Sequence, residues 1–192
     1  FIPATKVGNP TFSDDKILGT NSYAGATDSY VTFPSADIIG EEFSAVFWYK
    51  LDPVPDRAGI LIISPEGEDR NHGLRFAREA DGANQKFFLN VGNGTAESWF
   101  VPPSFAPTSD WMHIALSVSG THAAVYINGA IVSEGDFGPI DWTGCDLLSV
   151  GSGLPRFGYW DHKADNSLYD ELRIFDRAIT TAEIQHIRDV EL

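Results

Sequence analysis

The sequence predicts an all-β protein in which two antiparallel sheets pack face to face. Eighteen glycines and eleven prolines separate short apolar segments along a chain of 192 residues, a spacing typical of many short strands joined by turns. Some of these segments also alternate apolar and polar residues, as half-buried strands do. A single open sheet of this many strands would leave one apolar face in water, so a second sheet is expected to cover it.

The clearest alternation lies in residues 112–118, where every second residue from Met112 to Val118 is apolar. We expect this face to be core, and we expect the opposite face, with His113, Ala115 and Ser117, to lie outside it. The next strand ends at Asn128-Gly129, a dipeptide typical of a type I′ turn. The predicted strands are Tyr30–Phe33, Ala45–Leu51, Gly59–Ile63, Gly73–Ala77, Lys86–Val91, Ser98–Val101, Met112–Val118, Ala123–Ile127, Leu147–Val150 and Ser167–Phe175.

One short helix is predicted, at the C-terminal end of the chain. Thr180 and Glu183 have the spacing of a capping box, and Ile179 and Ile184 flank it as a hydrophobic staple. The helix presents an apolar face that can dock on the sandwich, and we expect it to end near Asp189. Because no linker, repeat or low-complexity tract is visible, residues 1–192 are expected to form a single domain.

Composition and charge exclude several classes of function. The formal net charge is -14, from 13 Lys and Arg against 27 Asp and Glu, so nucleic acids and other polyanions would be repelled at long range. No apolar stretch approaches the roughly 20 residues that cross a bilayer. Cys145 is the one cysteine, which rules out an internal disulfide and cysteine-based zinc sites. The chain begins at Phe1 rather than Met, and we expect a secreted, periplasmic or cell-surface location, with the chain a monomeric domain of a larger protein.

A series of motifs resembles one known family over roughly Tyr23 to Ile187. The motifs are Tyr30-Val31-Thr32-Phe33, Phe43–Tyr49, Trp111-x-His113-Ile114-Ala115, Val125–Gly129, Val150-Gly151, Tyr169–Phe175, Ala178-Ile179 and Glu183-Ile184. In order and spacing they resemble the laminin G-like domains of the concanavalin A-like lectin/glucanase superfamily. The resemblance implies a two-sheet antiparallel jelly-roll β-sandwich that serves as a carbohydrate-binding, adhesion or accessory module. Each motif also has a structural cause, such as Trp111, which we expect to be a core anchor.

The same superfamily contains glycoside hydrolases that carry a Glu-x-Asp-x-x-Glu cluster on one strand. Such spacing places the carboxylates on one face, as a nucleophile and a general acid require. This sequence lacks that cluster: Glu66-x-Glu68-Asp69 lies in a turn region, and the adjacent Asp170 and Glu171 should point to opposite faces. An enzyme therefore remains only as an alternative, in which a carboxylate pair is assembled from distant strands.

The loop 153–166 is the main candidate for ligand binding. Sugars present apolar C–H faces and hydroxyl edges, so their sites combine exposed rings with polar side chains. The candidate residues in this loop are Tyr159, Trp160, Asp161, His162 and Asn166. Trp99 is a separate candidate, on a strand that could line the concave sheet. The alternatives are that the loop aromatics plug the open end of the sandwich and that Trp99 belongs to the core. Trp142 is expected to cap the sandwich.

The resemblance also implies one structural Ca²⁺, held where the last strand meets the N-terminal segment. The matching residue is Asp170, and Asp28 would supply a further oxygen ligand. The alternative for Asp28 is a solvated turn residue.

Together these observations predict a non-catalytic carbohydrate-binding or carbohydrate-associated module whose partner is a polysaccharide or glycan. A protein-interaction or adhesion module that binds an extracellular protein is the first alternative, and a glycoside hydrolase of the same fold is the second.

Overall fold

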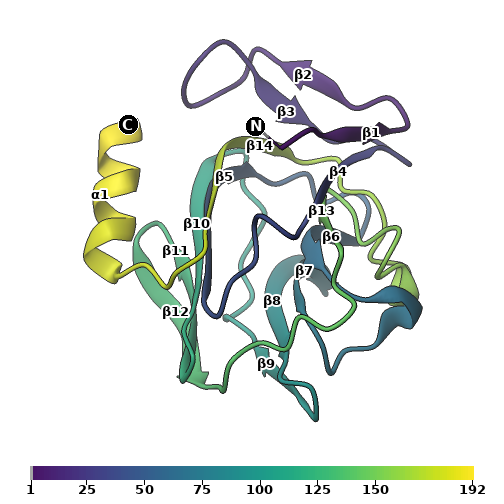
Figure 1. Ribbon diagram of the computed structural model, residues 1–192. Helices are drawn as coiled ribbons and strands as arrows, with labels where there is room; N and C mark the ends of the chain where they lie inside the picture. Colours follow the sequence, from purple (N-terminus) through teal and green to yellow (C-terminus); the bar gives the residue numbers. More distant parts are fainter. Residues whose placement is uncertain (1) are drawn as a thin grey trace.

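The computed structural model describes residues 2–192, and Figure 1 shows two facing layers of strands with one helix beside them. Sheet A contains, in spatial order, β1 (Thr5–Val7), β4 (Tyr30–Pro34), β13 (Leu147–Val150), β6 (Arg57–Ile63), β7 (Leu74–Asp81), β8 (Asn84–Gly92) and β9 (Glu97–Phe100). Sheet B contains β12 (Ala130–Asp136), β11 (His122–Ile127), β10 (Trp111–Val118), β5 (Phe43–Lys50), β14 (Leu168–Phe175), β3 (Ser22–Ala24) and β2 (Thr11–Ser13). The predicted jelly-roll sandwich is confirmed.

The strand order brings distant parts of the chain together. In sheet B, β5 pairs antiparallel with β10 along its whole length, from Lys50 opposite Trp111 to Phe43 opposite Val118, and its other edge pairs with β14. In sheet A, β13 lies between β4 and β6, whereas β6, β7, β8 and β9 follow one another as hairpins. The turn at Asn128-Gly129 has positive φ at both residues, as predicted for a type I′ turn.

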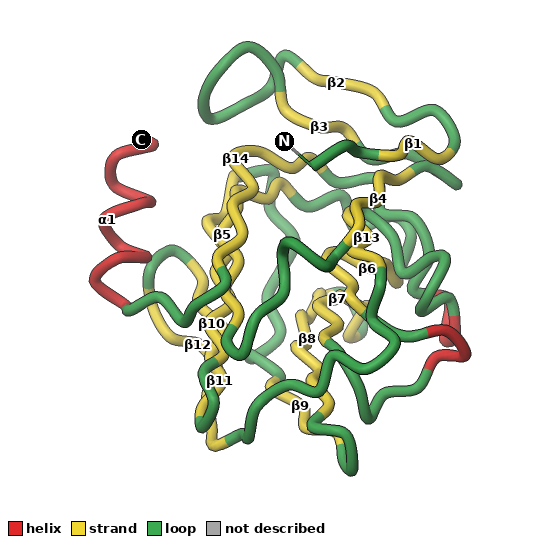
Figure 2. Tube along the Cα trace, viewed as in Figure 1, coloured by secondary structure: helices red, strands yellow, loops and turns green. Residues whose placement is uncertain are grey.

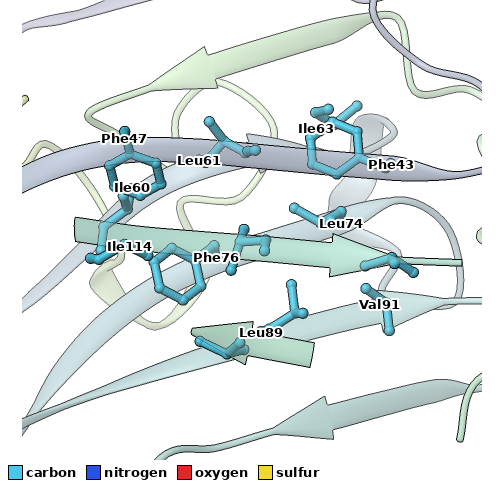
Figure 3. Packing of buried hydrophobic residues seen from close by; sticks show 14 of the residues in the cluster. Phe43, Phe47, Ile60, Leu61, Ile63, Leu74, Phe76, Leu89, Val91 and Ile114 are labelled. Atoms are coloured by element: carbon cyan, nitrogen blue, oxygen red, sulfur yellow. The ribbon is translucent and has the colours of Figure 1, made fainter. Parts of the chain in front are cut away.

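The main core lies between the two sheets and is built from the alternate apolar residues of each strand. Figure 3 shows Phe43 and Phe47 of β5 facing side chains of β6, β7 and β8. The rings of Phe47 and Phe76, from opposite sheets, meet edge to face with centroids 6.3 Å apart. The position of Phe47 leaves its neighbour Trp48 on the outer face of β5.

The outer face of sheet B is not solvated, which corrects the prediction for residues 112–118. His113 and Ala115 are fully buried because α1 (Thr181–Glu191) covers them with Ile184 (Figure 1). The helix has the predicted capping box at Thr180 and Glu183 but continues past Asp189. Among residues 2–192, no helix has the length and apolar character needed to span a bilayer.

Four strands and one side chain differ from the sequence predictions. The strands β1, β2 and β3 have only three residues each, too few for an alternation to be seen, and β12 is a largely exposed edge strand. Trp111 is half-buried at the start of β10 rather than a core anchor, because its indole N–H donates to Asp15 Oδ1 (2.9 Å) near the surface. The differences in the strands and in Trp111 lie in segments that are short or exposed, where the sequence shows no continuous apolar face.

Candidate functional site

The segment 151–167, here called the covering loop, folds over the outer face of sheet A. Ser149 on β13 donates to Leu154 O (2.7 Å), and Gly59 N on β6 donates to Lys163 O (3.1 Å). Close approach requires glycine at Gly153, where a Cβ would lie 2.0 Å from the carbonyl oxygens of Phe157 and His162. Figure 2 shows the two 3-10 turns, η1 (Glu66–Glu68) and η2 (Tyr159–Asp161), on the side of the sandwich away from α1.

A fully buried arginine anchors the floor beneath the covering loop. The guanidinium of Arg75 on β7 donates to Asn90 Oδ1 (2.8 Å), Ser64 Oγ (2.9 Å) and Asp69 O (2.6 Å), and it also contacts Arg70 O and His72 O. The Phe157 ring of the covering loop lies over the same guanidinium at 5.5 Å. Burial lowers the pKa of Arg75 to about 10. One side chain thus ties β7, β8, the loop after β6 and the covering loop into a single support.

Three exposed aromatic side chains stand on this support, and we call Trp99, Tyr159 and Trp160 the aromatic surface. Trp99 is 38% exposed, Trp160 is 40% exposed and Tyr159 is 61% exposed. The indoles of Trp99 and Trp160 lie nearly parallel, with centroids 6.2 Å apart and planes inclined by 24°, and the Tyr159 ring lies 5.7 Å from Trp160. The structure therefore brings together residues 60 positions apart in the sequence that were predicted separately.

The backbone that presents Trp160 is strained. Trp160 has φ of 62° and Asp161 has φ of 61°, so two consecutive residues other than glycine occupy the left-handed region. For a side chain as bulky as tryptophan this conformation costs on the order of 1–3 kcal/mol, and such strain is concentrated at functional sites.

A shallow notch of about 90 Å³ lies beside the aromatic surface, with Phe88 buried at its base. Its lining residues are Glu79, Lys86, Phe88, Trp99, Val101, Trp160 and His162. Glu79 and Lys86 face each other across β7 and β8 and form an ion pair (3.1 Å), and Arg57 approaches the same carboxylate at 3.6 Å. Glu79 and Lys86 were not predicted as site residues, although their alternation with the core residues of β7 and β8 places them on the outer face.

The other loop residues predicted to bind ligand have different positions. Asp161 is exposed and pairs with Lys163 (3.1 Å). His162 is fully buried against Phe88, with ring centroids 5.1 Å apart, and burial lowers its pKa. It is nevertheless one of the residues that line the notch. Asn166 is half-buried near the entry to β14 and does not line the notch. The structure thus separates Asn166 from the aromatic surface.

Other hollows on the described chain are larger but are built differently. One of about 630 Å³ lies beside Trp142, whose ring packs on Phe43 and whose indole N–H donates to Gly40 O (2.7 Å). Trp142 therefore caps the sandwich, as predicted. Another of about 460 Å³ is lined mainly by aliphatic and phenyl side chains, including Phe33 of β4 and Leu172 of β14. Neither combines several exposed rings with paired charges.

Asp170 and Asp28, the residues predicted to bind calcium, have the following surroundings in the structure. The Asp170 carboxylate accepts backbone N–H groups from Ile17 (2.8 Å), Leu18 (3.0 Å) and Glu171 (3.0 Å), so donor hydrogens point at the oxygens that a cation would need. Asp28 is exposed in the turn before β4, with its backbone close to Gly8. Among the side chains that the structure describes, no group of three or more His, Cys, Asp or Glu is arranged to hold a metal. Asp170 instead fastens the β2–β3 connection to β14.

The family model described as the concanavalin A-like lectin/glucanases superfamily, of laminin G type, matches residues 25–185. The chain belongs to this superfamily. The match covers the motifs that pointed to it, from the strand at Tyr30 to the start of α1. No curated protein sequence matches this superfamily member.

Solved structures similar to this superfamily member include two kinds of domain. Domain 4 of AbnA, a GH43 extracellular arabinanase from Geobacillus stearothermophilus in complex with arabinotriose, is 21% identical, with a TM-score of 0.72 over 97% of this chain and 88% of that one. The binding domain of botulinum neurotoxin DC in complex with SialylT is 14% identical, with a TM-score of 0.69 over 100% of this chain and 46% of that one. The chain thus spans about half the length of the neurotoxin domain. At these identities the likeness shows the fold alone.

Proposed function

We propose that this protein is a non-catalytic glycan-binding module and that the aromatic surface is its binding site. The observation that carries the proposal is the joint exposure of Trp99 and Trp160 on a rigid support, beside a notch with a charged pair. Aromatic faces stack on the C–H faces of sugar rings, and polar groups at the edge of the stack bind the hydroxyls. The strained turn at Trp160 supports a functional role for the exposed indole.

The similar structures support a glycan as the ligand. One is a domain of an extracellular arabinanase crystallised with arabinotriose, and another is a toxin binding domain in complex with SialylT. We extend carbohydrate recognition from these proteins to this chain, and we propose that it acts outside the cell on a polysaccharide or glycan.

The acidic residues support binding rather than hydrolysis. Most glycosidases need two carboxylates at the scissile bond. Among the described residues that line the notch, Glu79 is the one carboxylate. Four of the other acids considered from the sequence have structural partners: Glu66 pairs with Arg156, Asp69 with His72, Glu171 with Arg173, and Asp170 with backbone amides. We therefore propose that no catalytic pair operates at this site.

The aromatic surface is tested by Trp160→Ala in titrations against arabinan, galactan, mannan and cello-oligosaccharides. We expect the wild-type protein to bind at least one of them, and we expect the variant to bind about five- to tenfold more weakly, because the loss of one stacked ring costs roughly 1–1.5 kcal/mol. Calorimetric titration measures the affinity directly.

The matched control is Phe12→Ala, which removes a ring that is 67% exposed on β2, in the other sheet. This variant should bind as the wild type does. Absence of binding to every glycan in the panel, or equal losses in the two variants, would refute the proposed site.

A further inference from the structure

We propose that the site selects uncharged glycans, and that Glu79 and Lys86 together bind neighbouring hydroxyl groups of the sugar stacked on the aromatic surface. This inference rests on the proposed function and assigns the ligand class to it. Its basis is the way the charges around the notch are paired.

Four described cations in or near the notch contact three carboxylates, because Lys86 and Arg57 share that of Glu79. Lys86 and Arg57 both contact Glu79, at 3.1 and 3.6 Å. Arg70 pairs with Glu97 (3.3 Å), and Lys163 pairs with Asp161 (3.1 Å). The guanidinium of Arg70 also lies 4.8 Å from the centre of the Trp160 ring, over its face. A uronate, sulfate or sialate group would have to compete with these carboxylates for each of the four cations.

The charge of the whole chain acts in the same direction. A formal net charge of -14 produces a negative field that repels polyanionic chains before they reach the surface. Neutral glycans are unaffected by this field. Selectivity against anionic glycans therefore arises both from long-range repulsion and from the local pairing of cations.

The Glu79–Lys86 pair matches the hydrogen-bonding capacity of a sugar edge. A carboxylate only accepts hydrogen bonds, an ammonium only donates them, and a hydroxyl does both. Two adjacent hydroxyls can thus donate to Glu79 and accept from Lys86 without breaking the ion pair. Both side chains are partly covered, with 22% and 31% of their surface exposed, so these hydrogen bonds are stronger than in open water.

The decisive variant is Glu79→Gln, which keeps the shape of the side chain and leaves Lys86 and Arg57 without a carboxylate partner. The probes are cellohexaose, mannohexaose and galactohexaose, each compared with the same chain oxidised at C6 to uronate. In the wild type we expect each uronate to bind at least about tenfold more weakly than its neutral counterpart. In the variant we expect neutral affinity to fall about five- to tenfold and uronate affinity to rise, so that the two agree within about threefold.

Two further variants make the result interpretable. Asp189→Asn removes an arginine-paired carboxylate from α1, on the opposite side of the sandwich, and should leave the selectivity unchanged. Lys86→Met leaves Glu79 paired with Arg57, so it should weaken neutral binding without improving uronate binding, and it carries the test if Glu79→Gln does not fold.

The possible failures are distinguishable. Equal wild-type affinity for neutral and oxidised chains would overturn the inference, as would unchanged selectivity in Glu79→Gln, and in both cases binding that depends on Trp160 would leave the proposed function intact. Absence of any binding that depends on Trp160 would remove the proposed function and the inference with it.

Discussion

Replacement of Asp165 by alanine is expected to lower the free energy of unfolding by about 3–5 kcal/mol, because it leaves a buried arginine without its counter-ion. Asp165 and Arg78 are both fully buried at the edge of the core, and Arg78 Nη2 lies 2.8 Å from Asp165 Oδ1. The hydroxyls of Tyr49 (2.7 Å) and Tyr169 (2.6 Å) donate to Asp165 Oδ2. Burial, together with the charge of Asp165, holds the pKa of both tyrosines well above its ordinary value, so both remain donors.

The measurement is urea or thermal unfolding of the purified variant. In a chain of this length the expected loss corresponds to a fall in Tm of roughly 6–20 °C. The matched control is Asp146→Ala, which breaks an exposed ion pair with Arg156 and should cost at most about 1 kcal/mol. If Asp165→Ala costs no more than this control, the buried contacts of Asp165 with Arg78, Tyr49 and Tyr169 do not stabilise the fold.

Stability is also expected to fall on acidification, because His113 is buried in its neutral form under α1. Burial, with the positive charges of Arg188 and Arg173, lowers the pKa of His113 to about 4, and Asp189 opposes this shift. In the described structure neither ring nitrogen has a hydrogen-bond partner. The unfolded chain binds the proton near pH 6.5 and the folded chain binds it near pH 4, so the stabilisation is complete above 6.5 and is lost between 6.5 and 4. The loss amounts to roughly 3 kcal/mol.

The comparison that isolates this effect is His113→Phe, which keeps a ring of similar size beside Trp48 and cannot be protonated. Its free energy of unfolding at pH 7 should equal or exceed that of the wild type, because two unpartnered buried nitrogens are removed. Burial raises the pKa of Glu191, so the folded chain binds this proton more readily than the unfolded chain does, and acidification through that pKa adds stability. Both proteins contain Glu191, so this contribution cancels in the comparison. Parallel stability curves for the two proteins between pH 7 and pH 4 would show that His113 does not control the acid response.

The sandwich could be predicted from the sequence because its central strands are long enough to show an alternation. The residues of β10 that face Phe47 and its neighbours repeat every second position, and the Asn128-Gly129 turn follows directly from its residue types. The same alternation led to the wrong environment for His113, since a strand pattern cannot show that a helix from the end of the chain covers the polar face. Strands of three residues carry no readable period, which explains why β1, β2 and β3 were not predicted.

The candidate site could be predicted only in part. Exposed aromatics in a glycine-rich loop indicated Tyr159 and Trp160, but the burial of His162 depends on how that loop folds back on sheet A. The pairing of Glu79 with Lys86 depends on the register of β7 and β8, which short-range sequence patterns do not define. The left-handed backbone at Trp160 is likewise a product of tertiary packing, because tryptophan has no intrinsic preference for it.

The most direct test of glycan binding at the aromatic surface is to follow the five tryptophan indole N–H signals by ¹H–¹⁵N NMR while a neutral oligosaccharide from the panel is added. Trp99 and Trp160 should shift in a saturable way, whereas Trp48, Trp111 and Trp142, which lie elsewhere with bonded N–H groups, should not. Saturable binding that moves Trp142 or Trp111 and leaves Trp99 and Trp160 in place would contradict the account.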